Sequence, residues 1–225
     1  MYCFWSAKGG AGCTVSATAA GLVLAETVPT LLVDLGGDVM SVLGSAGARA
    51  GRIGVADWLQ TVSAPAEALT GLEVEIHETL SVLPWGYQLG FPDVNRDAVV
   101  VLGDALRSDP RMVVVDVGIH WRLFYQLLIQ SDHSWLVTRS CYLALCRAIS
   151  APGADGVVVV REVGRTFNRQ NIEDALGAVV VLELPCAPEI ARVVDAGLLA
   201  SHIPDKLAPL RSVLAAIGKI DPEMS

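Results

Sequence analysis

Charged residues are scarce in this chain of 225 residues, and its apolar runs are short. Lys, Arg, Asp and Glu make up 18% of the residues and hydrophobic residues 52%. Most helices and strands should therefore be buried on at least one face. No apolar run reaches the roughly 18–20 residues that a membrane-spanning helix needs. The N-terminus also lacks the basic start and apolar stretch of a signal peptide. We expect a cytoplasmic protein.

Paired cysteines and clustered histidines are also missing. The chain has five cysteines and four histidines. The cysteines, an odd number with no CxxC pair, are Cys3, Cys13, Cys141, Cys146 and Cys186. Neither a disulfide framework nor a zinc site is indicated, and free thiols in a reducing compartment are expected.

An excess of basic residues is absent as well. The formal net charge is −8 and the pI is about 4.9. This balance argues against non-specific nucleic-acid binding by the whole surface. Arg161, Arg165 and Arg169 are the best candidates for a local basic patch, but an ordinary solvated face is the better interpretation. We do not expect a nucleic-acid partner.

The most informative stretch is residues 6–14, Ser-Ala-Lys-Gly-Gly-Ala-Gly-Cys-Thr. It follows a short apolar run at 2–5 and precedes a run of small and apolar residues at 15–25. A strand, a glycine-rich turn and a helix start in this order form a cradle of backbone N–H groups for an anion. A phosphate-binding loop normally has a lysine directly before its Ser or Thr. Here that position is Cys13, and Lys8 stands at the head of the loop. The alternative is a tight strand-to-helix turn with no ligand.

The arrangement K-G-G-x-G-x-T at residues 8–14 resembles the deviant Walker A motif of the MinD/ParA family. The resemblance implies ATP and Mg²⁺ as ligands and a homodimer that encloses the nucleotides. The loop residues that would bind the nucleotide are Lys8, Gly9, Gly10, Ala11, Gly12, Cys13 and Thr14. In this family the early lysine, here Lys8, reaches the partner's phosphates and takes part in catalysis. Thr14 matches the magnesium ligand, while Cys13 departs from the family's second lysine.

Two buried carboxylates are expected near this loop. Residues 30–34 and 112–118 read as buried parallel strands, which would deliver Asp34 and Asp116 to the carboxyl edge of a sheet. Asp116 is predicted to hold the water shell of a magnesium ion, as in a Walker B strand. Asp34 is predicted to contribute to the same magnesium site; the alternative is a turn cap.

The segment after Asp34 is similar to the switch segment of MinD/ParA proteins. In the family, the second carboxylate of an Asp-x-Asp helps to activate the attacking water. Gly36 occupies that position here, and Asp38 would take over the catalytic role only if the loop shifts. With Cys13 and Gly36 in place of charged residues, weak nucleotide binding and slow or absent hydrolysis are expected.

Strands and helices alternate along the rest of the chain. This pattern predicts a single domain over residues 1–225. Its fold class is α/β, one doubly wound, mainly parallel sheet with helices on both faces, as in P-loop NTPases. Further strands are expected at 72–76, 80–86, 134–138, 157–160 and 178–184. Further helices are expected at 55–59, 93–107, 123–129, 142–149, 168–176, 190–196 and 206–217, with a turn and helix start at 64–67.

The C-terminal third carries two more features. The loop around Pro185 resembles the family's proline-containing loop that flanks adenine, which makes Pro185 a nucleotide-binding candidate. Arg161 and Glu162 stand where many relatives have an adenine-reading asparagine. The last helix should dock on the sheet, so any membrane contact would be at most peripheral.

The resemblance extends to a function. The Gly-Asp-Val stretch at 37–39, followed by an apolar helix, is most similar to the CpaE/TadZ-like, pilus-assembly branch of the family. We expect an ATP-dependent dimerisation switch that positions pilus, secretion or division-site machinery through an unidentified protein partner. The alternative is a pseudo-ATPase scaffold. A ligase of the dethiobiotin-synthase type would need the missing lysine.

Overall fold

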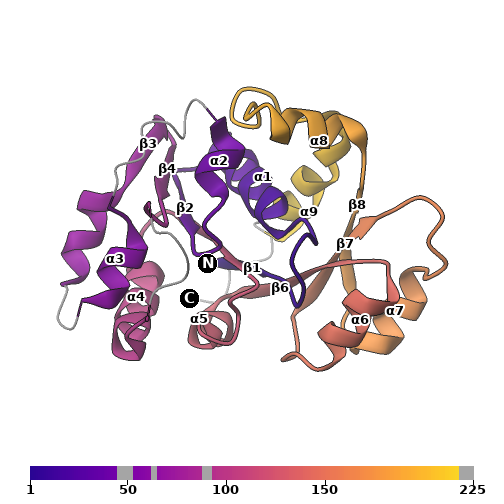
Figure 1. The fold of residues 1–225 in the computed structure, drawn as a ribbon. Coiled ribbons are helices and arrows are strands. Elements are labelled where there is room, and N and C mark those ends of the chain that lie inside the picture. Colours follow the sequence, from indigo (N-terminus) through magenta and orange to yellow (C-terminus); the bar gives the residue numbers. More distant parts are fainter. Residues whose placement is uncertain (45–52, 62–64, 88–92, 218–225) are drawn as a thin grey trace.

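One twisted sheet organises the molecule. The computed structural model describes residues 1–44, 53–61, 65–87 and 93–217. In this part of the chain, eight strands form the sheet (Figure 1). The strands are β1 Tyr2–Trp5, β2 Thr30–Asp34, β3 Val74–His77, β4 Leu80–Leu83, β5 Met112–Gly118, β6 His133–Arg139, β7 Gly156–Arg161 and β8 Val180–Pro185.

The strand order is β3-β4-β2-β5-β1-β6-β7-β8. Only the edge strand β3 runs antiparallel, to β4; the other neighbouring pairs are parallel. The carboxyl ends of β1, β2 and β5 therefore meet at one edge near the middle of the sheet. Ligands of doubly wound sheets bind at such an edge.

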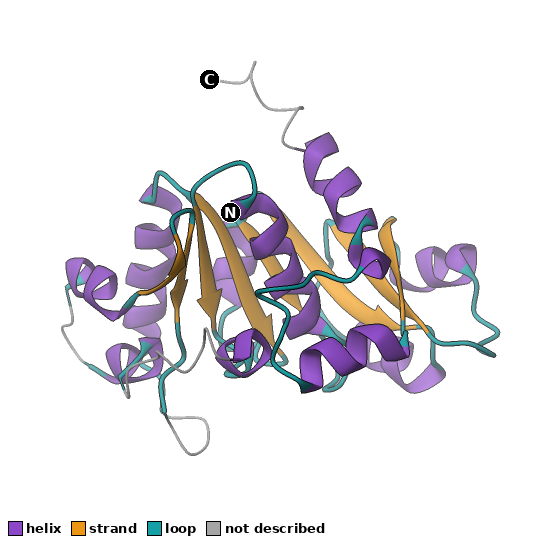
Figure 2. Ribbon diagram, turned by 90° about the horizontal axis from the view of Figure 1, so that it is seen from above, coloured by secondary structure: helices purple, strands orange, loops and turns teal. Residues whose placement is uncertain are grey.

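Helices cover both faces of the sheet (Figure 2). They are α1 Cys13–Ala25, α2 Val39–Leu43, α3 Val55–Gln60, α4 Arg96–Ser108, α5 Tyr125–Gln130, α6 Tyr142–Ile149, α7 Arg169–Leu176, α8 Pro188–Asp195 and α9 Pro209–Ile217. Helices α1, α2, α8 and α9 lie on one face, and α3 to α7 lie on the other (Figure 1). Two 3-10 helices, η2 Ala66–Leu72 and η3 Asp205–Leu207, complete the described elements.

The side chains of the central strands alternate between two apolar cores. Tyr2 and Phe4 of β1 belong to the core that α1 and α9 cover. Cys3 and Trp5 belong to the core that α4 and α5 cover. This alternation follows from the two-residue period of a strand, and burial on both faces explains why the strands read as continuous apolar runs.

The predicted α/β fold class, with its doubly wound, mainly parallel sheet, is confirmed. One element was predicted wrongly: residues 206–217 do not form a single helix. Instead, η3 ends at Leu207 and α9 begins at Pro209. Proline has no N–H and fixes its φ angle, so it suits a first helical position and disfavours an interior one. The turn predicted at 64–67 lies partly outside the described residues.

Helix α9 docks as expected. Its Leu210 and Leu214 are buried in the core that contains α1, and Arg211 pairs with Glu26 at the end of α1. None of the helices in the described ranges has the combined length and apolar character needed to cross a bilayer.

Candidate nucleotide site

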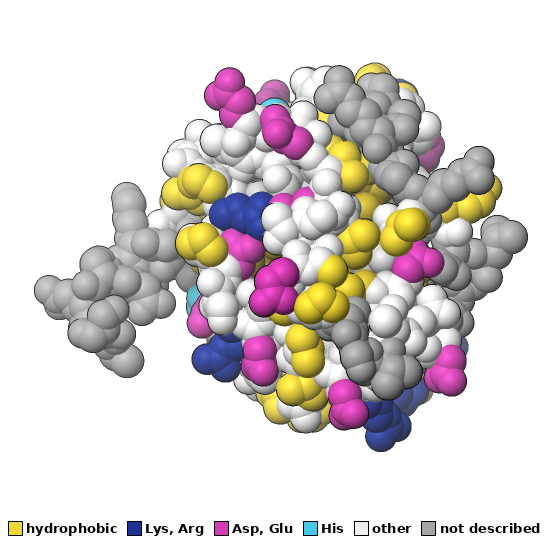
Figure 3. Space-filling model, turned by 90° about the vertical axis from the view of Figure 1, so that its left-hand side faces the viewer, with side chains coloured by type: hydrophobic (Ala, Val, Ile, Leu, Met, Phe, Trp, Pro, Cys, Tyr) yellow, Lys and Arg dark blue, Asp and Glu magenta, His cyan; other side chains and the backbone are white. Residues whose placement is uncertain are grey.

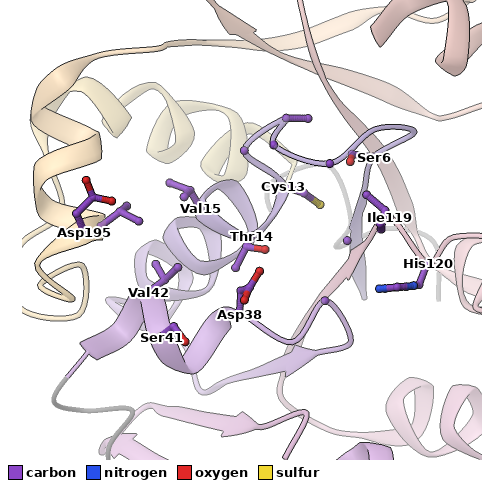
Figure 4. Close-up of a pocket in the computed structure, with 17 residues that line it drawn as sticks. Ser6, Cys13, Thr14, Val15, Asp38, Ser41, Val42, Ile119, His120 and Asp195 are labelled. Carbon is purple, nitrogen blue, oxygen red and sulfur yellow. The ribbon is translucent and has the colours of Figure 1, made fainter. Parts of the chain in front are cut away.

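A cavity of about 550 Å³ opens at the carboxyl edge of the sheet (Figure 4). The loop after β1 forms one wall, with Ser6 and residues 9–15. Gly36, Asp38 and two residues of α2, Ser41 and Val42, form another. Residues 118–120 after β5 and Val194 and Asp195 of α8 complete it. The topology therefore brings the predicted glycine loop and the predicted switch segment to one site.

The glycine loop has the backbone of an anion cradle. Gly10 and Gly12 have φ angles of 72° and 93°, a left-handed conformation that side chains disfavour. Gly12 immediately precedes α1 and has no side chain to accept from the first-turn amides. These amides and the positive end of the helix dipole face the region where a phosphate would lie.

Positive side chains are missing from the cavity wall. Among the described residues that line it, none is Lys or Arg, whereas Asp38 and Asp195 are acidic. Lys8 lies at the loop but outside the lining, and its Nζ donates to the Gly9 carbonyl at 3.2 Å. Charge neutralisation from within this site must therefore come from backbone N–H groups or from a bound cation.

Cys13 is buried at the start of α1, where a phosphate-binding loop normally has its lysine. Burial raises the pKa of its thiol well above the ordinary value, and the nearby Asp116 carboxylate raises it further. The thiol is therefore neutral at physiological pH. It fills part of the space beside Asp116 without supplying positive charge.

Asp116 is completely buried at the end of β5. Its Oδ1 accepts from the Gly118 N–H at 3.1 Å, while Oδ2 has no hydrogen-bond partner among the described residues. Burial raises the pKa of Asp116, and the Thr14 hydroxyl and Cys13 thiol partly oppose this shift. An unsatisfied buried carboxylate oxygen next to a hydroxyl fits a site for a hydrated Mg²⁺ ion.

Gly36 lies against the Asp116 carboxylate. A Cβ atom at Gly36 would lie 2.7 Å from Asp116 Oδ2, closer than any ordinary contact. A side chain at the position that carries the second carboxylate in the predicted family would therefore require the Asp116 side chain or the loop to move.

Asp34 is buried and acts as a turn cap. Its Oδ1 accepts from Gly37 N–H at 2.6 Å and its Oδ2 from Val39 N–H at 3.1 Å. It does not line the cavity. Asp34 is in register with Asp116 on the neighbouring strand. Burial is the main reason, and the charge of Asp116 the second, why the pKa of Asp34 rises to about 7. Asp34 thus has the contacts of a turn cap. Its role in magnesium binding stays a prediction.

Asp38 does reach the site. It precedes α2, lies exposed on the cavity wall, and its side chain and that of Thr14 point toward each other (Figure 4). His120 lines the opposite side, and burial lowers its pKa, so the ring is neutral at physiological pH. No group of three or more His, Cys, Asp or Glu side chains is placed to hold a metal in the described ranges. Any Mg²⁺ would therefore need water and phosphate ligands beside Thr14 and Asp116.

A second cavity of about 230 Å³ adjoins the first. The two share Gly12, Val15, Val194 and Asp195. Pro185, predicted as a nucleotide-binding residue, lines this second cavity. Arg161, in the position of the family's asparagine, does not line it; it pairs with Glu183 and donates to the Phe167 carbonyl.

The candidate basic patch is neutralised by neighbouring carboxylates. Arg161, Arg165 and Arg169 pair with Glu183, Glu162 and Glu173, respectively. On the side of the molecule that carries β3, α3 and α4, acidic, basic and apolar side chains are interspersed (Figure 3).

Several solved structures superpose on this chain over almost its whole length. MinD from Aquifex aeolicus superposes with a TM-score of 0.78 at 16% identity over 100% of both chains, and MinD from that organism has also been solved in a MinC:MinD complex. MinD from Pyrococcus horikoshii complexed with Mg-ADP gives 0.71 at 17% identity over 98% of this chain and 97% of that one. A ParA family ATPase from Chlorobium tepidum gives 0.71 at 16%, over 95% and 98%.

The chain has the fold of the MinD and ParA ATPases. No family model and no curated protein sequence matches it. At identities this low, the superpositions establish the MinD/ParA fold alone. The chemistry of this chain must be argued from its own residues.

Sequence reasoning did not find two parts of the site. Asp195 lies at the end of α8, far along the chain from the glycine loop, and only the packing of α8 brings it to the cavity. Arg139, the last residue of β6, lines the second cavity. Its place at the carboxyl end of a buried strand was the one available signal.

Proposed function

We propose that this chain binds Mg-ATP at the glycine loop. The observation that carries the proposal is the loop itself. Gly10 and Gly12 have left-handed backbone conformations, the start of α1 that follows them has no side-chain cap, and the loop lines a cavity. Gly9 to Thr14 would surround the phosphates with backbone N–H groups. Thr14 and Asp116 would hold the hydrated Mg²⁺, which neutralises phosphate charge when bound.

The same site argues for weak or absent hydrolysis. Phosphoryl transfer requires cations on the transferred group and an oriented water. The wall described here offers no Lys or Arg, and a side chain at Gly36 would require Asp116 or the loop to move. Asp38 is left as the carboxylate for water activation. These departures favour, as a second candidate, a pseudo-ATPase scaffold that keeps the fold without turnover.

Nucleotide-dependent dimerisation would complete the site. Lys8 lies at the loop but not on its own cavity wall, so its ammonium is available to a partner's phosphates. Four exposed apolar residues follow the carboxyl ends of β5, β6 and β7, and one of them, Ile119, lines the cavity. These residues, Ile119, Tyr142, Leu143 and Val163, form what we call the carboxyl-edge patch. A homodimer through this patch would bury apolar surface together with the nucleotide.

The biological role would be positioning of other machinery. The resemblance of residues 37–39 to the CpaE/TadZ-like branch favours pilus or secretion machinery over a division site, reached through a protein partner in the cytoplasm. The MinC:MinD complex is a precedent for a partner on this fold.

Calorimetric titration with Mg-ATP, followed by light scattering, tests the proposal. We expect weak binding, a doubling of mass with Mg-ATP, and little phosphate release. Binding without a change in mass would favour the scaffold. An absence of binding would reject nucleotide recognition altogether.

A Cys13→Lys variant tests whether the rest of the site is intact. The new ammonium would lie beside Asp116 and the phosphate region, so Mg-ATP affinity should rise about tenfold or more. Cys13→Ser is the matched control, because it keeps a small polar side chain without adding charge. Equal affinity of both variants would contradict a phosphate position next to Cys13.

Lys8→Ala tests the role of Lys8 across the dimer. We expect this variant to bind Mg-ADP as the wild type does, because Lys8 lies outside its own cavity, and to stay monomeric with Mg-ATP. A dimer of unchanged stability would disprove the cross-subunit contact.

A further inference from the structure

Helices α2 and α8 end against each other. The chain leaves each of them through a glycine with a left-handed backbone, Gly44 with a φ of 68° and Gly197 with a φ of 62°. A Cβ atom at Gly44 would overlap the carbonyl group of Gly197, and a Cβ atom at Gly197 would lie 2.6 Å from Gly44 Cα. Any larger residue at either position must therefore push the two backbones apart.

Each glycine is fixed to its own helix by hydrogen bonds. The Gly44 N–H donates to carbonyls in α2. After α8, the Gly197 N–H donates to the Val194 carbonyl and the Leu198 N–H to the Val193 carbonyl, both at 2.9 Å. This pair of bonds is a Schellman motif, a common way to end a helix. Because both glycines are fixed, the contact between them also fixes α2 relative to α8.

The two helix ends that meet here also line the first cavity. Asp38, which precedes α2, and Ser41 and Val42 within it form one part of the wall, and Val194 and Asp195 of α8 form another (Figure 4). The separation of α2 and α8 therefore sets the shape of the cavity on this side.

Helix α2 depends on its neighbours because it has only five residues, too few for a helix that is stable alone. At its start, Asp34 Oδ2 accepts from the Val39 N–H at 3.1 Å. Val39, Val42 and Leu43 pack in the core. At its end, the contact with Gly197 is the remaining constraint on its position.

We infer that Gly44 and Gly197 are positioning residues of the nucleotide site. Their contact holds α2 against α8 and thereby keeps Asp38 beside Thr14. The consequence for ligand binding rests on the proposed function, whereas the consequence for α2 does not. A larger residue at either glycine displaces α2 and changes the cavity wall without itself touching a ligand.

Amide hydrogen exchange on the full chain without nucleotide tests the effect on α2. In Gly197→Ala, the α2 amides should exchange about tenfold faster or more, the effect expected from one overpacked contact. The amides of β5 report global unfolding, and their exchange should accelerate less than that of α2.

Gly177→Ala is the matched control. Gly177 ends α7 with a φ of 63°, and a Cβ atom there would meet nothing within 4 Å. This variant therefore introduces the same backbone strain without the collision, and exchange in α2 should not accelerate beyond that in β5. If Gly197→Ala folds poorly, Gly197→Asn against Gly177→Asn repeats the comparison, because Asn tolerates a left-handed backbone but still carries a Cβ atom.

Calorimetric titration with Mg-ATP tests the effect on the site. Gly197→Ala should bind about tenfold more weakly than the wild type, and Gly177→Ala as the wild type does. Gly44→Ala combined with Gly197→Ala should lose less affinity than the sum of the single losses, because both substitutions break one contact.

Equal exchange in α2 for Gly197→Ala and Gly177→Ala would overturn the inference, and so would an unchanged Mg-ATP affinity of Gly197→Ala. If the wild type binds no Mg-ATP, the proposed function fails. The exchange comparison alone then decides whether the two glycines position α2.

Discussion

Two acidic side chains in register on adjacent strands dominate the chemistry of the site. Asp34 and Asp116 are both buried, and each accepts hydrogen bonds from backbone N–H groups. Asp116 also lies beside the Thr14 hydroxyl and the Cys13 thiol. A lysine at position 13 would ordinarily lie close to them. Burial, with no ammonium group at position 13 to oppose it, raises the pKa of both carboxyls, so the site is sensitive to pH.

The pH dependence of stability should reveal Asp34. Its pKa is about 7 when folded, against an ordinary value of 3.8. Between these values the folded chain binds more protons than the unfolded chain, so stability falls as pH rises toward 7. From pH 5.5 to 8 this loss should reach about 2 kcal/mol, from about 1.4 kcal/mol per pKa unit.

Urea denaturation of Asp34→Asn at both pH values checks this expectation. The variant should lose most of that pH dependence, whatever its absolute stability. The exposed neighbour Asp38→Asn is the control and should keep most of it, because the charge of Asp38 is the smallest of the effects on the pKa of Asp34. A variant with the wild-type slope would show that Asp34 does not titrate in this range.

Gly36→Ala tests the contact with Asp116. The new Cβ would lie 2.7 Å from Oδ2, so the buried carboxylate or the loop must move. We expect a loss of about 1–3 kcal/mol in unfolding free energy, as for overpacked sites. Gly9→Ala is the control, because its Cβ would meet nothing within 4 Å, and it should change stability little. Equal stability of both variants would contradict the close approach.

At the scale of elements, α1 connects the site to the core. Its first residue faces Asp116, and its residues from Ser16 to Ala25 are buried. The orientation of the glycine loop therefore depends on packing far from the cavity. Helix α9 supplies part of that packing through Leu210 and Leu214.

Leu214→Ala should destabilise the protein by about 2–5 kcal/mol, the range for a buried leucine that leaves a cavity. Denaturant unfolding measures the loss, and Ser212→Ala, an exposed position on the same helix, should be nearly neutral. If Leu214→Ala were also neutral, α9 would not be docked in solution.

At the scale of the whole molecule, the carboxyl-edge patch is where a second copy would bind. Leu143→Asp should abolish the Mg-ATP-dependent dimer, because it places a charge in the proposed interface, while monomer stability stays within about 0.5 kcal/mol for an exposed site. Ile149→Asp is the matched control: it is exposed on the same helix, α6, but at the opposite end. Loss of dimer in both variants, or in neither, would place the interface elsewhere. Light scattering measures the outcome.

Much of this architecture could be predicted because local patterns determined it. Continuous apolar runs such as 112–115 predicted parallel strands, and the glycine loop predicted the site at the carboxyl edge. What could not be predicted depends on packing between distant segments. The Gly36–Asp116 contact and the position of Arg139 arise from strand register and loop closure, which leave no periodic signal in the sequence. The residues alone left Asp34 open between a part in the magnesium site and a turn cap.

The Gly36–Asp116 contact also has an evolutionary consequence. A mutation that placed a carboxylate at position 36 would force the Asp116 side chain or the loop to move, and a lysine at position 13 alone would restore charge while leaving only Asp38 to activate water. A descendant of this chain would need several coordinated changes, with unfavourable intermediates, to become an efficient hydrolase. The present site is therefore expected to persist in its lineage once a function independent of turnover maintains it.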